Sequence, residues 1–184
     1  MIMRTFYVSV LELALLEKLI VFGRSYTHEL SKNLTISPAH VNRLCHALRK
    51  RQILNVSSQE NRKFFELNYQ CLLTRELLRF ITVIKIKNSK YFRKLGEICP
   101  FGVFGSFSEG MQTKESDLDL WVFSDRSFEK KIRLIINDIE KEWEHIINIV
   151  YLDKNKLEIM KKNDPEFYYR LRSQSLTERG DIFE

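Results

Sequence analysis

The spacing of apolar positions predicts three helices in the first third of the chain. Residues 9–22 place apolar side chains at helical intervals, and the glycine that follows them, Gly23, suits a helix C-cap. A second helix is predicted over about 26–34. A third is predicted over about 37–51, because a serine suited to an N-cap is followed by a proline at the first helical position.

Two short strand-like runs follow the third helix, at 53–57 and 63–67, with the polar stretch 58–62 between them. Such a pattern predicts a β-hairpin. The order of elements is helix, helix, tight turn, helix and hairpin. It resembles that of the winged helix-turn-helix family over residues 9–68.

The resemblance implies that the third helix and the hairpin, or wing, bind DNA. In that family the third helix enters the major groove and the wing contacts the backbone. The residues that would face DNA are His40, Asn42, Arg43, His46, Arg49 and Lys50 on the helix and Arg62 and Lys63 on the wing. Arginine and asparagine can pair with base edges, whereas lysine and the wing residues would hold phosphates. The alternative is that the basic residues form only the solvated side of an amphipathic helix.

Residues 71–95 are predicted to form a helical segment with apolar side chains on one side and basic side chains on the other. This segment would connect an N-terminal domain at 1–70 to a C-terminal domain at 96–184. Its apolar stripe could equally mediate a homodimer, since many winged-helix proteins bind two half-sites.

A turn suited to phosphate binding follows the apolar run 98–104, which predicts a buried strand. Gly105 has no side chain, so backbone N–H groups at this turn can approach a phosphate closely. The hydroxyl of Ser106 adds a donor at the N-terminus of a short helix, where the dipole favours an anion. Gly110 is predicted to end that helix.

The next strand, predicted over 117–123, begins with Asp117-Leu118-Asp119. Alternate residues of a strand point to opposite faces, so Asp117 and Asp119 project from the same side. Two carboxylates in this arrangement suit shared divalent cations such as Mg²⁺, which prefer oxygen ligands. In two-metal catalysis a pair of such ions activates the attacking hydroxyl and neutralises charge on the triphosphate. By itself, Asp-x-Asp also occurs in surface loops, and the preceding strand and Gly-Ser turn favour the metal site.

These features together resemble the minimal nucleotidyltransferases of the DNA polymerase beta superfamily, which include antitoxin subunits of two-gene toxin-antitoxin systems. The resemblance covers about residues 96–184 and is carried by the string FGVFGSFSEGMQTKESDLDLWVF. A predicted helix at 127–144, a strand at 146–152 and a closing helix from Asp164 to near Gly180 follow in the order of that family. The fold class predicted for the whole chain is therefore α+β, with a winged helix-turn-helix followed by a mixed sheet flanked by helices.

The resemblance implies transfer of a nucleoside monophosphate, usually AMP from ATP, to a hydroxyl or phosphate acceptor. Gly105 and Ser106 would hold the triphosphate, and Asp117 and Asp119 would ligate Mg²⁺. Lys114, in the loop before the aspartates, is a further candidate for phosphate binding, although it also suits a plain surface position.

Two residues depart from the family pattern. The family carries a third carboxylate on the strand after the long helix, and the matching residue here is Asn148. An amide can offer its carbonyl to a cation but cannot act as a base near pH 7. Asp153 is five residues further on and is expected on the opposite face. Glu109 stands where many relatives have an arginine, and its charge should weaken triphosphate binding.

Charge separates the two halves of the chain. Residues 1–95 hold 17 lysines and arginines against 6 glutamates, while residues 96–184 hold 13 against 18 acidic residues. A basic half suits a polyanion such as DNA, and an acidic half suits a divalent cation or a basic partner. The three separated cysteines fit reduced thiols, and no apolar run is long enough to cross a bilayer. We therefore expect a cytoplasmic protein without a membrane partner.

Three functions remain open from the sequence. The first is a metal-dependent nucleotidyltransferase coupled to DNA binding, with Asp117, Asp119 and Asn148 at its catalytic centre. The second is a winged-helix regulator whose second domain binds nucleotide or a partner without catalysis. The third is an antitoxin that represses its own operon and modifies or blocks a small helical toxin-like protein, an interpretation that rests on the family resemblance.

Overall fold

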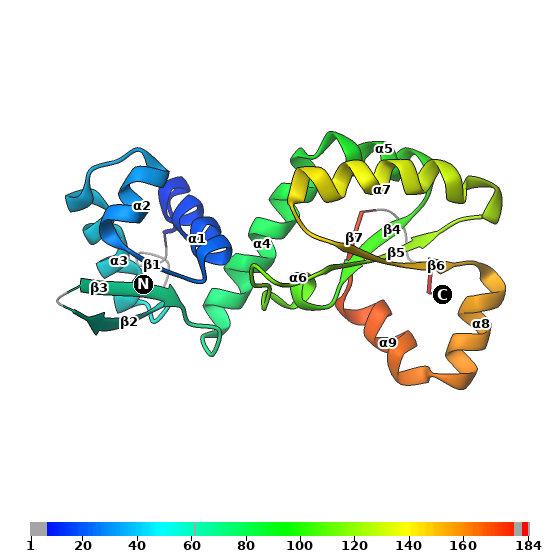
Figure 1. Cartoon of the computed structure of the whole chain (residues 1–184). Coiled ribbons are helices and arrows are strands. Elements are labelled where there is room, and N and C mark those ends of the chain that lie inside the picture. Colours follow the sequence, from blue (N-terminus) through cyan, green and yellow to red (C-terminus); the bar gives the residue numbers. More distant parts are fainter. Residues whose placement is uncertain (1–6, 61, 179–181, 184) are drawn as a thin grey trace. The chain divides into compact units, whose positions relative to one another are not determined.

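The computed structural model describes residues 7–60, 62–178 and 182–183. The chain divides into two compact units, Met1–Ile81 and Thr82–Glu184. Figure 1 shows the elements of both units in chain order. None of the helices in the described ranges is both long enough and apolar enough to cross a membrane.

The N-terminal unit has the winged helix-turn-helix fold that the sequence predicts. Its elements are α1 (Val10–Phe22), β1 (Arg24–Tyr26), α2 (Thr27–Leu34), α3 (Pro38–Lys50), β2 (Leu54–Gln59), β3 (Arg62–Leu67) and the first part of α4 (Leu72–Asn88). Across the described part of this unit, the strands form an antiparallel sheet in the order β1-β3-β2. The hairpin β2-β3 is the predicted wing.

Local signals in the sequence set the ends of α1 and α3. The Ser9 hydroxyl accepts a hydrogen bond from the backbone of Glu12 while the Glu12 carboxylate accepts one from the backbone of Ser9, a capping box. Gly23 ends α1 at a φ of 67°, where a side chain would be strained. The Ser37 hydroxyl caps α3 by accepting from the backbone of His40. These boundaries match the predicted ones.

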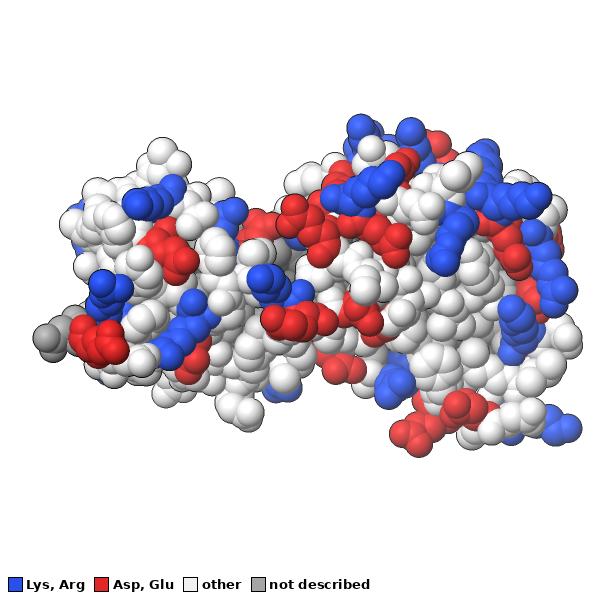
Figure 2. Space-filling view, viewed as in Figure 1, with Lys and Arg blue, Asp and Glu red and all other residues white. Residues whose placement is uncertain are grey.

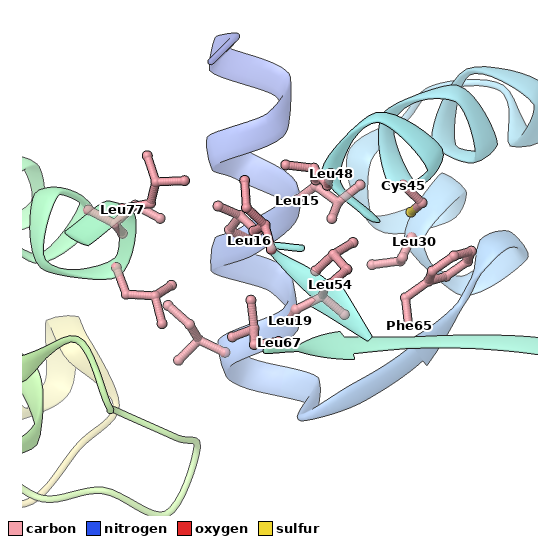
Figure 3. Close-up of a cluster of buried hydrophobic side chains, with 14 of the residues drawn as sticks. Leu15, Leu16, Leu19, Leu30, Cys45, Leu48, Leu54, Phe65, Leu67 and Leu77 are labelled. Atoms are coloured by element: carbon pink, nitrogen blue, oxygen red, sulfur yellow. The ribbon is translucent and has the colours of Figure 1, made fainter. Parts of the chain in front are cut away.

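One apolar core holds this unit together, as Figure 3 shows. Every helix of the unit and the wing contribute to it, through Leu15, Leu16 and Leu19 of α1, Leu30 of α2, Cys45 and Leu48 of α3, Leu54, Phe65 and Leu67 of the strands, and Leu77 of α4. At its edge the buried carboxylate of Glu12 pairs with Arg51, which follows α3. This ion pair ties the start of α1 to the end of α3.

The C-terminal unit is built on a mixed sheet. Its elements after the second part of α4 are α5 (Lys90–Ile98), β4 (Phe101–Phe104), α6 (Ser106–Glu109), β5 (Leu118–Phe123), the 3₁₀ turn η1 (Arg126–Phe128), α7 (Glu129–Trp143), β6 (Ile147–Leu152), α8 (Lys154–Asn163), α9 (Pro165–Gln174) and β7 (Leu176–Thr177). Among the residues that the structure describes, the strand order is β6-β5-β4-β7, with β5 and β6 parallel and the other neighbours antiparallel. Helices α5 and α7 cover one face of the sheet, and α8 and α9 cover the other (Figure 1).

The structure corrects several predicted elements. The segment 71–95 is two helices, because the Ser89 side chain caps a new helix by accepting from the backbones of Tyr91 and Phe92. Ile98 belongs to the end of α5, so the strand begins only at Phe101. The strand β1 and the helix α8 were not predicted. The closing helix ends at Gln174 and is followed by β7, and its predicted end at Gly180 lies outside the described residues.

Candidate functional site

Strand β5 divides its side chains between the two faces of the sheet. Leu118, Leu120 and Val122 enter the core formed with α5 and α7. Asp119 and Trp121 therefore point to the opposite face, and Trp121 packs in the core formed with α8 and α9. Asp117 immediately precedes the strand and lies exposed. The two aspartates thus lie at the start of β5.

Asn148 joins these aspartates because β6 runs parallel to β5. In the register of the two strands Asn148 is the partner of Asp119. Its side-chain nitrogen Nδ2 donates to Asp117 Oδ2 and to Asp119 Oδ1, both at 3.3 Å. One neutral amide thus bridges the two carboxylates and offsets part of their repulsion.

Gly105 brings the turn after β4 against the same group. Phe104 pairs with Asp119 across the sheet, and Gly105 follows with a φ of 66°. A Cβ atom at Gly105 would lie only 2.2 Å from Asp119 Oδ2. Only glycine therefore allows the backbone of this turn to approach the carboxylate so closely.

The short helix α6 fixes the turn in place. The carbonyl oxygen of Gly105 accepts from the backbone of Ser108 at 3.0 Å, from its hydroxyl at 2.9 Å, and from the backbone of Glu109 at 3.1 Å. Gly110 ends the helix with a φ of 69°, as predicted. Ser106, the first residue of α6, is half-buried beside the turn, while Glu109 is exposed.

The loop that leads to Asp117 is held by His145, whose contact partners the sequence did not reveal. His145 Nδ1 lies 2.9 Å from the carbonyl oxygen of Ser116, and its ring meets the ring of Phe107 edge-on at 5.2 Å. Burial lowers the pKa of His145. The neutral ring can donate from Nδ1 to that carbonyl. The available signal was the position of His145 directly before the predicted strand 146–152. Lys114 lies exposed in the same loop.

The donor set suits one Mg²⁺ ion bound together with phosphate. Mg²⁺ is usually held by one or two carboxylates together with substrate phosphates and water. Asp117 and Asp119 supply the carboxylates, and the backbone of the Gly105 turn lies directly against Asp119. Within the described ranges no three or more His, Cys, Asp and Glu side chains form a group that could hold a metal ion by themselves. Asp153 is not part of the site, since its Oδ1 caps α8 by accepting from the backbone of Lys156 at 2.7 Å.

In the N-terminal unit, some of the predicted DNA-facing residues line a groove and the others lie outside it. A groove of about 440 Å³ lies between α3 and the wing, and its described lining consists of Thr27, Asn42, His46, Arg49, Val56, Lys63 and Phe65. Thr27 donates from its hydroxyl to Asn42 Oδ1 at 2.9 Å. This bond joins α2 to α3. It uses the amide oxygen of Asn42, so the side chain can still donate hydrogen bonds from its amide nitrogen.

The remaining residues of α3 lie outside that lining. Arg43 and Lys50 are exposed on the helix, and His40 is half-buried near its start. Arg43 and Lys50 are seven residues apart and so share one side of α3.

Arg62 and Lys63 point to opposite faces of the wing, because they are neighbours on β3. Lys63 faces the groove, whereas the Arg62 guanidinium lies 5.5 Å from the ring of Tyr26 on the outer face. Arg24 of β1 joins Arg62 there, 4.1 Å from the ring of Phe64. Sequence reasoning missed Arg24, since a three-residue strand carries too little alternation to be recognised.

The two units differ in net charge. Residues 1–81 hold 12 lysines and arginines against 6 glutamates, whereas residues 82–184 hold 18 basic and 18 acidic residues. Figure 2 shows both signs intermixed on the visible face of the C-terminal unit. The excess positive charge of the protein therefore belongs to the winged helix-turn-helix unit.

Comparison with known proteins identifies the C-terminal unit. A sequence model of the family described as polymerase beta, nucleotidyltransferase matches residues 84–176, just over half of the chain. No curated protein matches the chain. One similar solved structure is that of the AntR antimony-specific transcriptional repressor, at 24% identity and a TM-score of 0.36, covering 41% of this chain and 67% of that one. From the family match and the site built on β4, β5 and β6, the chain belongs to the polymerase beta nucleotidyltransferase family.

Proposed function

We propose that the protein is a Mg²⁺-dependent nucleotidyltransferase that transfers AMP from ATP to a hydroxyl acceptor with release of pyrophosphate, and that its N-terminal unit binds DNA. The observation that carries the proposal is the convergence of Asp117, Asp119 and the Gly105 turn at one end of the sheet. This arrangement places two anionic oxygen donors beside a backbone that can approach phosphate.

Each residue of the site has a distinct task in this proposal. Asp117 and Asp119 would hold the cation, which would neutralise charge on the triphosphate. The Gly105 turn admits the phosphates, and the Ser106 hydroxyl donates to them. Asn148 positions the two carboxylates but cannot act as a base. In this proposal water accepts the proton of the attacking hydroxyl.

Label transfer tests the catalytic part. The full chain is incubated with α-labelled ATP, Mg²⁺ and candidate acceptors, and label is followed on protein and on RNA. We expect label that disappears in Asp117→Asn and Asp119→Asn. Asp125→Asn is the matched control, because Asp125 is an exposed aspartate just beyond the other end of β5. Absence of label with every acceptor, or label that survives both substitutions, would overturn catalysis at this site.

A second function, favoured by Asn148, is nucleotide binding without transfer. The site has two carboxylates and an amide, so it retains cation and phosphate ligands but lacks a base. In that case calorimetry would detect ATP binding that depends on Mg²⁺ and Asp119, while no acceptor gains label. The chain would then be a DNA-binding regulator that responds to nucleotide.

The molecule that accepts AMP depends on which partner the protein binds. A small helical toxin-like protein is the acceptor in the antitoxin form of this proposal. A gene for such a protein beside this one, and label on its product after incubation, would support that form. Label on RNA alone would contradict it.

DNA binding is supported by the geometry of the first unit. The basic excess, the exposed Arg43 and Lys50 on α3, and the groove lined by Arg49 and Lys63 lie on one compact winged helix-turn-helix. A positively charged helix and wing suit the phosphate backbone and the major groove.

A further inference from the structure

We infer that Asn148 limits the site to a single divalent cation, which binds together with the triphosphate of the nucleotide. The inference rests on the proposed function, because it concerns the same Asp117–Asp119 site. It begins from the bridging amide, which donates to both carboxylates at 3.3 Å.

Charge sets the number of cations that this site can hold. Two cations of a two-metal site lie roughly 3.5–4 Å apart and repel each other, so anionic ligands must lie between and beside them. Asp117 and Asp119 together carry two negative charges, which one divalent cation neutralises. The partner position on β6 contributes a neutral side chain, because Asn148 is paired with Asp119. A second cation would therefore lack its protein anion.

The hydrogen bonds of Asn148 also make cation binding depend on nucleotide. In the structure the Asn148 amide directs its N–H donors at the carboxylates. A cation bound between the carboxylates would repel these donors. A cation must either leave that donor in place or turn the amide so that its carbonyl oxygen becomes a ligand. Both carboxylate–amide bonds are lost in the second case. Phosphate oxygens supply the missing ligands beside Gly105, so the cation binds well only with the triphosphate.

Counting bound Mn²⁺ tests this inference without measuring transfer. The full chain is titrated with Mn²⁺, with and without α,β-methylene-ATP, and free Mn²⁺ is followed by electron paramagnetic resonance. We expect one Mn²⁺ per wild-type chain with the analogue and much weaker binding without it. Asn148→Asp should bind two, and its first cation should bind about tenfold or more tightly, the scale on which changes around metal ligands alter affinity.

Two further variants separate the added charge from other effects. Asn137→Asp makes the same change at an exposed asparagine of α7 and should keep one cation. The double variant Asp117→Asn/Asn148→Asp returns the site to two carboxylates and should also bind one. Thermal unfolding gives an independent measurement: Asn148→Asp should melt lower than wild type without a divalent cation and gain more from Mn²⁺.

Two Mn²⁺ ions in the wild type, or only one in a folded Asn148→Asp, would overturn the inference while leaving the proposed function standing. Binding of neither Mn²⁺ nor the analogue by the wild type would overturn both. If Asn148→Asp does not fold, the wild-type count decides, and Asn148→Ala must still bind one cation.

Discussion

At the residue scale, individual side chains determine which ligands the candidate site can hold. The absent side chain of Gly105 gives space to Asp119, and the amide of Asn148 donates to Asp119 Oδ1. His145 holds the preceding loop through the Ser116 carbonyl. Each of these contacts can be removed by one substitution.

Gly105→Ala should damage both stability and cation binding. The added Cβ would lie 2.2 Å from Asp119 Oδ2, and alanine in this backbone conformation is strained by about 1–3 kcal/mol. Gly23→Ala is a matched control, because Gly23 has a φ of 67° with nothing within 4 Å of the added atom. Urea unfolding should show the backbone cost in both variants and a larger loss in Gly105→Ala. Equal losses and unchanged Mn²⁺ binding would contradict the close approach.

The cysteines should differ in reactivity. Burial raises the pKa of Cys45 to about 12 and that of Cys99 to about 11, whereas Cys71 is partly exposed. In the folded chain, dithionitrobenzoate at pH 8 should modify only Cys71, and Cys71→Ser should remove that reaction. The unfolded thiols ionise from about pH 8.5, so stability should fall as pH rises above that value. Rapid modification of all three thiols in the folded chain would contradict this prediction.

At the element scale, short connections fix the helices that present the candidate DNA surface. The bond from Thr27 to Asn42 joins α2 to α3, and the Glu12–Arg51 pair joins α1 to the end of α3. Arg51 Nη1 also donates to the Tyr7 carbonyl at 2.9 Å. These contacts hold α3 at both ends.

Glu12→Ala should destabilise the N-terminal unit by about 3 kcal/mol, because it leaves a largely buried arginine without its partner. Glu76→Ala is the comparison, since Glu76 forms an exposed pair with Arg79 on α4. An exposed pair contributes about 0.5 kcal/mol. Denaturant unfolding measures both, and similar small effects would show that the Glu12 pair adds little.

Arg43 and Lys63 should affect DNA binding differently. If Arg43 contacts a base, Arg43→Ala should weaken binding to the cognate site by about 1–3 kcal/mol and change affinity for unrelated DNA much less. Lys63→Ala should weaken binding to all sequences alike, as expected for a phosphate contact. Fluorescence anisotropy at fixed salt measures both, with Lys32→Ala, exposed at the end of α2, as the control. Equal loss on every sequence for Arg43→Ala would make it a phosphate contact.

At the scale of the whole molecule, charge and chemistry belong to different units. The excess of basic residues lies in Met1–Ile81, and the paired aspartates lie in Thr82–Glu184. Helix α4 contributes to both units, with Leu77, Leu78 and Ile81 in the first core and Ile86 in the second. The homodimer predicted from residues 71–95 stays a prediction, and Leu72 and Phe80 are the exposed apolar side chains of α4 that bear on it.

DNA affinity should therefore depend on salt and not on the aspartates. The logarithm of the association constant should fall linearly with the logarithm of salt concentration, by about 0.9 per phosphate contact. Asp119→Asn should leave this line unchanged, while Lys63→Ala should reduce its slope. Filter binding over a salt series provides the measurement, and loss of DNA binding in Asp119→Asn would show that the site and the DNA surface are coupled.

The sequence by itself determined the features that depend on local chemistry. Helix caps at Ser9, Ser37 and Gly23 follow from side-chain hydrogen bonds and backbone freedom within a few residues. The Gly105 turn and the two aspartates at the start of β5, Asp117 and Asp119, follow from spacing along the chain. For this reason the fold class was predicted correctly, whereas β1, α8 and β7 were not predicted.

The tertiary structure decided what depends on contacts between distant residues. Parallel pairing of β5 with β6 placed the Asn148 amide between Asp117 and Asp119, a relation that strand alternation within one segment cannot reveal. The break at Ser89 and the short strands β1 and β7 gain their stability from packing and from partner strands rather than from local pattern. Sequence spacing thus selected the candidate residues, and long-range pairing determined which of them meet.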